Sequence, residues 1–99
     1  MAEQTVSRTV VIPNQQGLHA RPADQFVKLA NQFSAQIEIQ RETLTVNGKS
    51  ILDLLTLAAE QGTELILHAT GDDATEASEA LAALVESFAE HDLEGEEDA

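Results

Sequence analysis

The sequence predicts a small α+β domain with two layers, in which four strands and three helices alternate in the order βαββαβα. Two observations support this fold class. Apolar and polar residues alternate in segments such as 36–41 and 64–70, as in half-buried strands, whereas apolar residues recur every three or four positions in 20–33 and 73–88, as on one helix face. A third observation concerns the links: only 36–41 and 42–46 follow each other closely enough for an antiparallel hairpin.

The first strand and the first helix each have one apolar side. Residues 5–12 are rich in β-branched side chains, with Val6, Val10 and Ile12 on the same face. A polar loop then leads into the helix expected over 20–33. The apolar stripe of this helix consists of Ala23, Phe26, Val27, Ala30 and Phe33. We expect both apolar sides to belong to one core.

The middle of the chain holds the predicted hairpin and the start of a short helix. Ile37 and Ile39 should face the core, and Asn47-Gly48 marks the turn that ends the second hairpin strand. Ser50 stands where a helix N-cap is expected. Asp53, three residues later, could reach back to the N–H of Ser50 and complete a capping box.

The helix after Ser50 is more apolar than a single core-facing stripe requires. Its apolar residues are Ile51, Leu52, Leu54, Leu55, Leu57 and Ala58. Together they cover more than the roughly 100° of a helix face that packs on a core, so some of them must face solvent. The alternative is a helix buried on nearly all sides. Gly62 is expected to take the left-handed conformation that ends this helix.

The last strand and the last helix complete the domain. The inward side chains of the strand 64–70 are Leu65, Leu67 and Ala69. His68 is on the opposite face and has no acidic residue or second histidine at ligand spacing, so we interpret it as an exposed strand residue. Asp73 and Glu76 form an expected cap pair for the final helix. The core stripe of that helix is Ala77, Ala80, Leu81, Leu84, Val85 and Phe88.

Composition limits the classes of function. The 99 residues suffice for one domain, expected over 5–89, and the acidic run 90–99 has little to bury, so we expect a disordered tail there. The absence of cysteine excludes disulfides and thiolate metal sites. A net charge of −13 argues against nucleic acid and anionic membranes as partners. No stretch approaches the length of a membrane span, and no targeting segment is evident, so we expect a cytoplasmic protein.

The segment 17–23, Gly-Leu-His-Ala-Arg-Pro-Ala, is the most informative part of the chain. It places His19 where the loop becomes a helix. Pro22 suits the first helical turn, because N–H groups there have no acceptor within the helix and the fixed φ of proline fits. An anion beside His19 would meet the backbone N–H groups of Ala20 and Arg21 and the guanidinium of Arg21. We therefore expect a histidine that accepts a phosphoryl group; the alternative is a capping or surface histidine.

The few basic residues cluster near the same segment. Of the five in the chain, Arg21, Lys28 and Lys49 lie in or beside 17–23 and 47–57. Arg21 and Lys28 are seven residues apart and so share one helix face. The sequence predicts a small basic island around the histidine on an otherwise acidic protein.

Two segments resemble a known family. The segment 17–23 resembles the phosphorylation-site motif of HPr, the histidine-containing phosphocarrier of the bacterial phosphoenolpyruvate-dependent sugar phosphotransferase system. The segment 47–57, Asn-Gly-Lys-Ser-Ile-Leu-Asp-Leu-Leu-Thr-Leu, resembles the regulatory-serine region of that family. Residues 62–67 and 69–71 resemble its last strand. The resemblance extends over about 5–89.

The resemblance implies both a topology and a reaction. The sheet would be antiparallel in the order 1-4-2-3, with three helices on one face and the other face open. His19 would accept a phosphoryl group through Nδ1 from the phosphohistidine of enzyme I and pass it to enzyme IIA, with Arg21 stabilising the phosphate. Neither a metal nor an organic cofactor is needed, so the protein would be a monomeric, stoichiometric carrier rather than an enzyme. In this topology the starts of the first two helices would bring His19, Arg21 and Ser50 to one surface.

The resemblance also implies a docking surface for partner proteins. In the helix after Ser50, Leu54 and Leu57 would then face the core. The docking residues would be Ile51, Leu52, Leu55, Lys28 and Lys49. Ser50 matches the site of regulatory phosphorylation in relatives that have an HPr kinase/phosphorylase; the alternative is a helix N-cap only. A phosphate on Ser50 would weaken the docking of acidic partners.

Two acidic residues bear on the choice of partner, and two alternative functions are compatible with the sequence. Asp24 lies near the proposed phosphate, and Asp53 stands where many relatives have glycine, so both bear on the choice of partner. One alternative function is a regulatory, nitrogen-type phosphorelay that is not coupled to sugar import. The other is a small binding module without phosphorylation, in which His19 is incidental.

Overall fold

The computed structural model describes the backbone of residues 3–98 and the side chains of residues 3–90. Its elements follow the predicted order βαββαβα. They are β1 (Thr5–Val11), α1 (Ala20–Ala30), β2 (Gln36–Arg41), β3 (Leu44–Asn47), α2 (Ile51–Thr56), β4 (Glu64–Thr70) and α3 (Ala74–Asp98).

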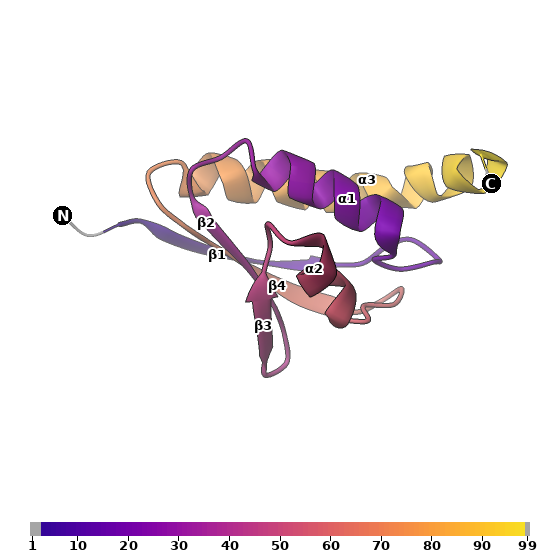
Figure 1. The fold of residues 1–99 in the computed structure, drawn as a ribbon, viewed down its shortest axis with the longest axis horizontal. Helices are drawn as coiled ribbons and strands as arrows, with labels where there is room; N and C mark the ends of the chain where they lie inside the picture. Colours follow the sequence, from indigo (N-terminus) through magenta and orange to yellow (C-terminus); the bar gives the residue numbers. More distant parts are fainter. Residues whose placement is uncertain (1–2, 99) are drawn as a thin grey trace.

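The four strands form one antiparallel sheet in the order β1-β4-β2-β3. Val10 of β1 stands opposite Leu65 of β4, while Ile39 of β2 stands between Leu67 and Val46. The long helices α1 and α3 lie side by side over one face of this sheet, and α2 packs beside α1 (Figure 1). The predicted open-faced sandwich is confirmed.

The core lies between the sheet and the helices, where the two apolar layers meet. Its largest fully buried apolar side chains are Phe88, Ile12, Ile37, Leu54, Leu57, Leu67 and Leu81. Burial of one such side chain is worth about 1.5–3 kcal/mol relative to leaving it exposed, so the set supplies the main driving force for this fold. The inward faces that the alternating patterns predict for β2 and β4 are confirmed.

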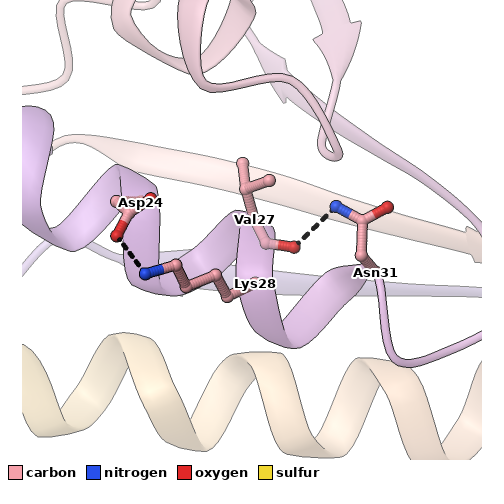
Figure 2. Close-up of polar contacts among 4 residues, drawn as sticks. All are labelled: Asp24, Val27, Lys28 and Asn31. Carbon is pink, nitrogen blue, oxygen red and sulfur yellow. Dashed lines mark hydrogen bonds and ion pairs between the residues drawn. The ribbon is translucent and has the colours of Figure 1, made fainter.

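Helix α1 is shorter than its apolar spacing predicts. It ends at Ala30 rather than near Phe33, because Asn31 is the C-cap and its side-chain Nδ2 donates to the carbonyl of Val27 at 2.9 Å (Figure 2). Phe33 still packs partly buried against the core from the turn that follows. The apolar periodicity therefore continues past the helix that it predicts.

Helix α2 is also shorter than predicted, and a different residue takes the left-handed conformation after it. The helix ends at Thr56, and Ala58 has a φ of 50°. Gly62, with a φ of 88°, instead belongs to the turn before β4, where its N–H donates to the Ile12 carbonyl at 2.8 Å. Arg41 stabilises this helix end, since its guanidinium donates to the carbonyls at 57 (2.7 Å) and 58 (2.9 Å).

The capping box predicted at α2 is half formed. The Ser50 hydroxyl accepts the N–H of Asp53 at 3.2 Å, as an N-cap does. The Asp53 carboxylate does not reach back to Ser50; it accepts the N–H of Asn47 at 3.2 Å. The Ser50 N–H donates to the Asn47 carbonyl, also at 3.2 Å. Asp53 therefore closes the turn before the helix rather than the helix itself.

Asp73, which directly precedes α3, joins two loops. Its carboxylate accepts the backbone N–H groups of Ser34 at 2.9 Å and Ala35 at 2.8 Å. These bonds hold the pKa of Asp73 below its usual 3.8, with the bond from Ser34 as the largest cause, although desolvation acts in the other direction. The side chain thus fastens the start of α3 to the connection between α1 and β2.

Helix α3 continues to Asp98 and so covers most of the acidic segment for which the sequence predicts disorder. Glu, Ala and Leu are good helix formers, so this segment favours a continued helix even though its composition offers little to bury. Ala99 lies outside the described residues. The domain boundary at residue 89 stays a prediction.

Candidate functional site

His19 is the N-cap of α1, where the sequence predicts it. Its backbone is extended, with φ −87° and ψ −169°, and its carbonyl accepts the N–H of Ala23 at 3.0 Å. In the described structure its side chain makes no capping hydrogen bond. The imidazole of His19 is half-buried and does not cap α1. This differs from α2, where the side chain of Ser50 caps the helix.

The loop that carries His19 is held against the end of α2. The N–H of Leu18 donates to the carbonyl of Ala59 at 2.8 Å. Gly17 has a φ of 75°, and a Cβ at this position would lie 2.5 Å from the same Ala59 oxygen. Only glycine allows both the backbone conformation and the close approach.

The first turn of α1 offers the groups that an anion requires. The first N–H groups of an α-helix have no acceptor within the helix, and the positive end of the helix dipole lies there. Ala20 and Arg21 are both exposed in this turn, directly after His19, and Pro22 is buried. These backbone groups and the Arg21 guanidinium are the predicted phosphate-binding set.

The two lysines do not join Arg21 in an island around His19. Lys28 lies further along α1, where it forms an exposed ion pair of 3.0 Å with Asp24 (Figure 2). Lys49 donates through Nζ to the carbonyl of Phe33 at 2.8 Å, beyond the other end of α1. Lys49 therefore joins the segment before α2 to the turn that follows α1.

The two helices near His19 run in opposite senses, contrary to the expectation that their starts share a surface. Lys49, just before α2, is bonded beyond the end of α1, whereas Ala59, just after α2, is bonded to the residue before His19. The end of α2 rather than Ser50 therefore adjoins the histidine loop. The spacing of residues along the sequence does not determine the relative direction of α1 and α2, because that direction depends on the path of the chain through β2 and β3.

Helix α2 divides its apolar residues between core and surface. Leu54 and Leu57 are buried, as predicted, at 1% and 2% exposure. Leu52 is 76% exposed and Leu55 37%, while Ile51 is half-buried and packs against the core. We call Ile51, Leu52 and Leu55 the apolar patch. It is attached through the end of α2 to the loop that carries His19.

The comparisons with known proteins agree on a family. The family model described as the phosphorylation site of the HPr component of the phosphotransferase system matches residues 6–87. The chain belongs to the HPr family. Its relatives include proteins named phosphocarrier protein HPr and HPr-like protein Crh, so the family links the chain to the phosphotransferase system.

Individual relatives and a solved structure cover nearly the same span. The phosphocarrier protein HPr of Borreliella burgdorferi is 41% identical over 86% of this chain and 99% of the relative. The HPr-like protein Crh of Bacillus subtilis is 43% identical over 82% of the chain and 95% of the relative. The HPr-C-His crystal structure from Thermoanaerobacter tengcongensis superposes with a TM-score of 0.80 at 45% identity, covering 83% of this chain and 92% of that one.

Two side chains that support the histidine loop of this HPr-family chain had no signal in the sequence. Asn14 is only 2% exposed in a loop whose polar composition predicts exposure. Arg41 ends an alternating strand, but its partners lie 16 and 17 residues further along the chain. Such burial and such long-range contacts form only when the whole chain folds, so they leave no local pattern in the sequence.

In the described part of the HPr-family chain, we find neither a metal site nor a membrane-spanning helix. Within it, no group of three or more His, Asp or Glu side chains could hold a metal ion. None of its helices is long and apolar enough to cross a membrane. His68 is half-buried on the open face of the sheet, where Nδ1 lies 2.7 Å from Ser7 Oγ and Nε2 lies 2.8 Å from Gln40 Oε1. Both ring nitrogens of His68 thus have strand neighbours as partners.

Proposed function

We propose that this HPr-family chain is a phosphocarrier that accepts a phosphoryl group on Nδ1 of His19 from phosphorylated enzyme I and donates it to a histidine of enzyme IIA. The observation that carries the proposal is the position of His19. It is the N-cap of an 11-residue helix whose first turn contains Arg21, and its ring is not used for capping.

The transfer needs few groups. The lone pair on Nδ1 of His19 forms a bond to phosphorus while the phosphorus–nitrogen bond of the donor phosphohistidine breaks, so the ring must be neutral with its proton on Nε2. In the loose transition state of phosphoryl transfer, charge spreads over the three equatorial oxygens. The N–H groups of Ala20 and Arg21 and the Arg21 guanidinium would stabilise that charge. The start of α1 would hold the phosphoryl group in position for the transfer. Transfer to enzyme IIA is the same step in reverse.

This step calls for neither a metal nor an organic cofactor, and the chain leaves it carrying one phosphoryl group, which it must hand on before it can accept another. We therefore propose a stoichiometric carrier in the cytoplasm, acting as a monomer, rather than an enzyme. The apolar patch would dock on enzyme I and enzyme IIA, with Lys28 and Lys49 as cations at the margin of the contact. Exposed aliphatic side chains suit a protein that must bind several partners in turn.

Ser50 would be the site of regulatory phosphorylation by an HPr kinase/phosphorylase. Its hydroxyl caps α2 at present, so a kinase must first break the bond to the N–H of Asp53. A phosphate there would gain from the helix dipole, but it would add negative charge beside Asp53 and Leu52. The expected consequence is weaker docking of acidic partners.

A labelling experiment tests the proposal. The protein is incubated with enzyme I and radiolabelled phosphoenolpyruvate, and we expect an acid-labile, base-stable label that His19→Ala abolishes. Arg21→Ala should keep the fold, shown by circular dichroism, and slow the labelling. The matched control is His68→Ala, which should label like the unaltered protein. Absence of label from the unaltered protein would leave the small binding module as the better description.

A second candidate, a regulatory branch not coupled to sugar import, has one observation in its favour. The solution structure of Crh is named a catabolite-repression HPr, and it is 44% identical to this chain. Labelled protein offered to a sugar-specific enzyme IIA and to a nitrogen-type enzyme IIA separates the two branches. The acceptor that removes the label faster identifies the branch that this chain serves.

A further inference from the structure

We propose that Asn14 is a positioning residue for His19. Its side-chain amide holds the carbonyl of Gly17, and the backbone N–H of His19 donates to that same carbonyl. The inference rests on the proposed phosphoryl transfer at His19 and adds a residue to its machinery. Asn14 lies five positions before the histidine, in a loop between β1 and α1, and does not belong to the segment 17–23.

Asn14 holds Gly17 from both sides. Its backbone carbonyl accepts the Gly17 N–H at 3.1 Å, and its side-chain Nδ2 donates to the Gly17 carbonyl at 2.6 Å. The same Gly17 oxygen accepts the N–H of His19 at 2.9 Å. One carbonyl therefore receives two donors, of which one is the buried Asn14 amide and the other is the backbone of the proposed nucleophile.

The orientation of the Asn14 amide follows from this geometry. Two oxygens 2.6 Å apart would repel each other, so the nitrogen must face Gly17. The amide oxygen Oδ1 is then buried and has no hydrogen-bond partner among the described residues. A buried acceptor without a partner destabilises the folded state. Asparagine at this position therefore combines the cost of one unpaired acceptor with the bond that its Nδ2 donates to Gly17.

The bond from Nδ2 restrains Gly17, the residue of this loop with the widest choice of backbone conformations. Gly17 has a φ of 75° and no side chain, so rotation about its backbone would tilt the next peptide groups. On the far side, the Leu18 N–H is fixed by Ala59 at 2.8 Å. With Asn14 on one side and Ala59 on the other, the backbone of His19 enters α1 in one orientation. Phosphoryl transfer depends on such alignment of the attacking nitrogen.

Substitutions at Asn14 separate positioning from simple folding. Asn14→Ala removes the donor, Asn14→Ser keeps a shorter donor, and Asn14→Asp replaces the donor by an acceptor. For enzyme I acting on this chain, we expect Asn14→Ala to lower kcat roughly 10- to 100-fold with KM unchanged, because docking on the apolar patch is intact. Asn14→Ser should recover part of the rate, and Asn14→Asp none.

A matched asparagine at the other end of α1 provides the control. Asn31 also donates through Nδ2 to a backbone carbonyl, that of Val27 at 2.9 Å (Figure 2), but it is exposed and not connected to the histidine loop. Asn31→Ala should therefore leave both kcat and KM unchanged. Melting temperatures of all four variants show whether any loss of rate merely follows a loss of stability.

A second measurement keeps the inference separate from the proposed function. Amide hydrogen exchange at His19 should become faster in Asn14→Ala and recover in part in Asn14→Ser, whether or not the protein is phosphorylated. If the unaltered protein takes no label, the proposed function fails and this exchange still decides the positioning role. Unchanged kcat together with unchanged His19 exchange in Asn14→Ala overturns the inference. A rise in KM that follows lost stability, without recovery in Asn14→Ser, overturns it as well.

Discussion

The backbone N–H of Leu18 donates to the carbonyl oxygen of Ala59 at 2.8 Å, and this bond joins the start of α1 to the end of α2. His19 follows Leu18 directly, and the apolar patch lies on α2. Arg41 holds the same end of α2 through the carbonyls at 57 and 58. The helix that carries the apolar patch is therefore hydrogen-bonded through its end to the loop that carries His19.

Substitution of Gly17 should damage both stability and transfer. In Gly17→Ala, the new Cβ would lie 2.5 Å from the Ala59 oxygen, and the φ of 75° would be strained. We expect the free energy of unfolding to fall by about 2–4 kcal/mol, measured by urea denaturation. The rate of labelling by enzyme I should fall as well, because relief of the clash must move Ala59 away from Leu18.

Gly62 supplies the control for this substitution. It also has a positive φ, 88°, but a Cβ at this position would meet nothing within 4 Å. Gly62→Ala should therefore cost only the conformational strain, about 1 kcal/mol, and leave the labelling rate unchanged. Equal losses of stability in the two variants would show that the close approach to Ala59 is not what requires Gly17.

Ala58 offers a stabilising substitution. Its φ of 50° is unfavourable for a residue with a Cβ, and Ala58→Gly should raise the free energy of unfolding by about 0.5–1 kcal/mol. Glu42, with a φ of 55°, is a second site where glycine should give a similar gain. Ala77→Gly, inside α3 and fully buried, should instead lower stability. Thermal melts of the three variants test the sign of each effect.

The fold and the position of the proposed phosphoryl acceptor could be predicted because both have local signals. Alternating residues such as Ile37 and Ile39 define a strand face, and they are 0% and 2% exposed. Pro22 and Gly17 fix the start of α1 through their backbone preferences, so His19 is placed at the N-cap without any tertiary information. Family resemblance then supplied the strand order, which periodicity does not determine.

What could not be predicted depends on contacts between distant segments. Lys49 was expected near His19, but its ammonium is bonded to the Phe33 carbonyl, since α2 runs opposite to α1. Asp53 has the spacing of a capping box, yet the turn brings the Asn47 N–H to its carboxylate. In both cases several acceptors or donors were compatible with the sequence spacing, and the chain path selected one of them.

Two leucines of α2 should separate docking from folding. Leu52 is 76% exposed, so Leu52→Ala should change stability by less than about 0.5 kcal/mol while raising the KM of enzyme I for this chain roughly 10-fold. Leu54 is 1% exposed, and Leu54→Ala should lower the free energy of unfolding by about 2–5 kcal/mol. Unfolding curves and steady-state labelling check both. An unchanged KM for Leu52→Ala would remove the apolar patch from the docking surface.

Asp73 should make stability depend on pH in the acid range. The N–H groups of Ser34 and Ala35 favour its carboxylate in the folded chain, so the pKa of Asp73 is lower when folded than its usual 3.8. A group with a lowered folded pKa stabilises the fold above the unfolded value, and that contribution is lost as the pH falls through the folded pKa. The unaltered protein should therefore lose stability below about pH 4 partly through this residue.

Substitution of Asp73 isolates its share of that dependence. Asp73→Asn cannot accept both N–H groups through two oxygens, so it should be less stable than the unaltered protein at about pH 7 and nearly equal to it at about pH 2.5. Urea unfolding at the two pH values measures the difference. Asp72→Asn, at the exposed neighbouring position, changes the net charge by the same amount and should leave the pH dependence as it is. If both variants lose the same stability at both pH values, the bonds from Ser34 and Ala35 do not favour the carboxylate, and the link between α3 and the loop after α1 is not electrostatic in origin.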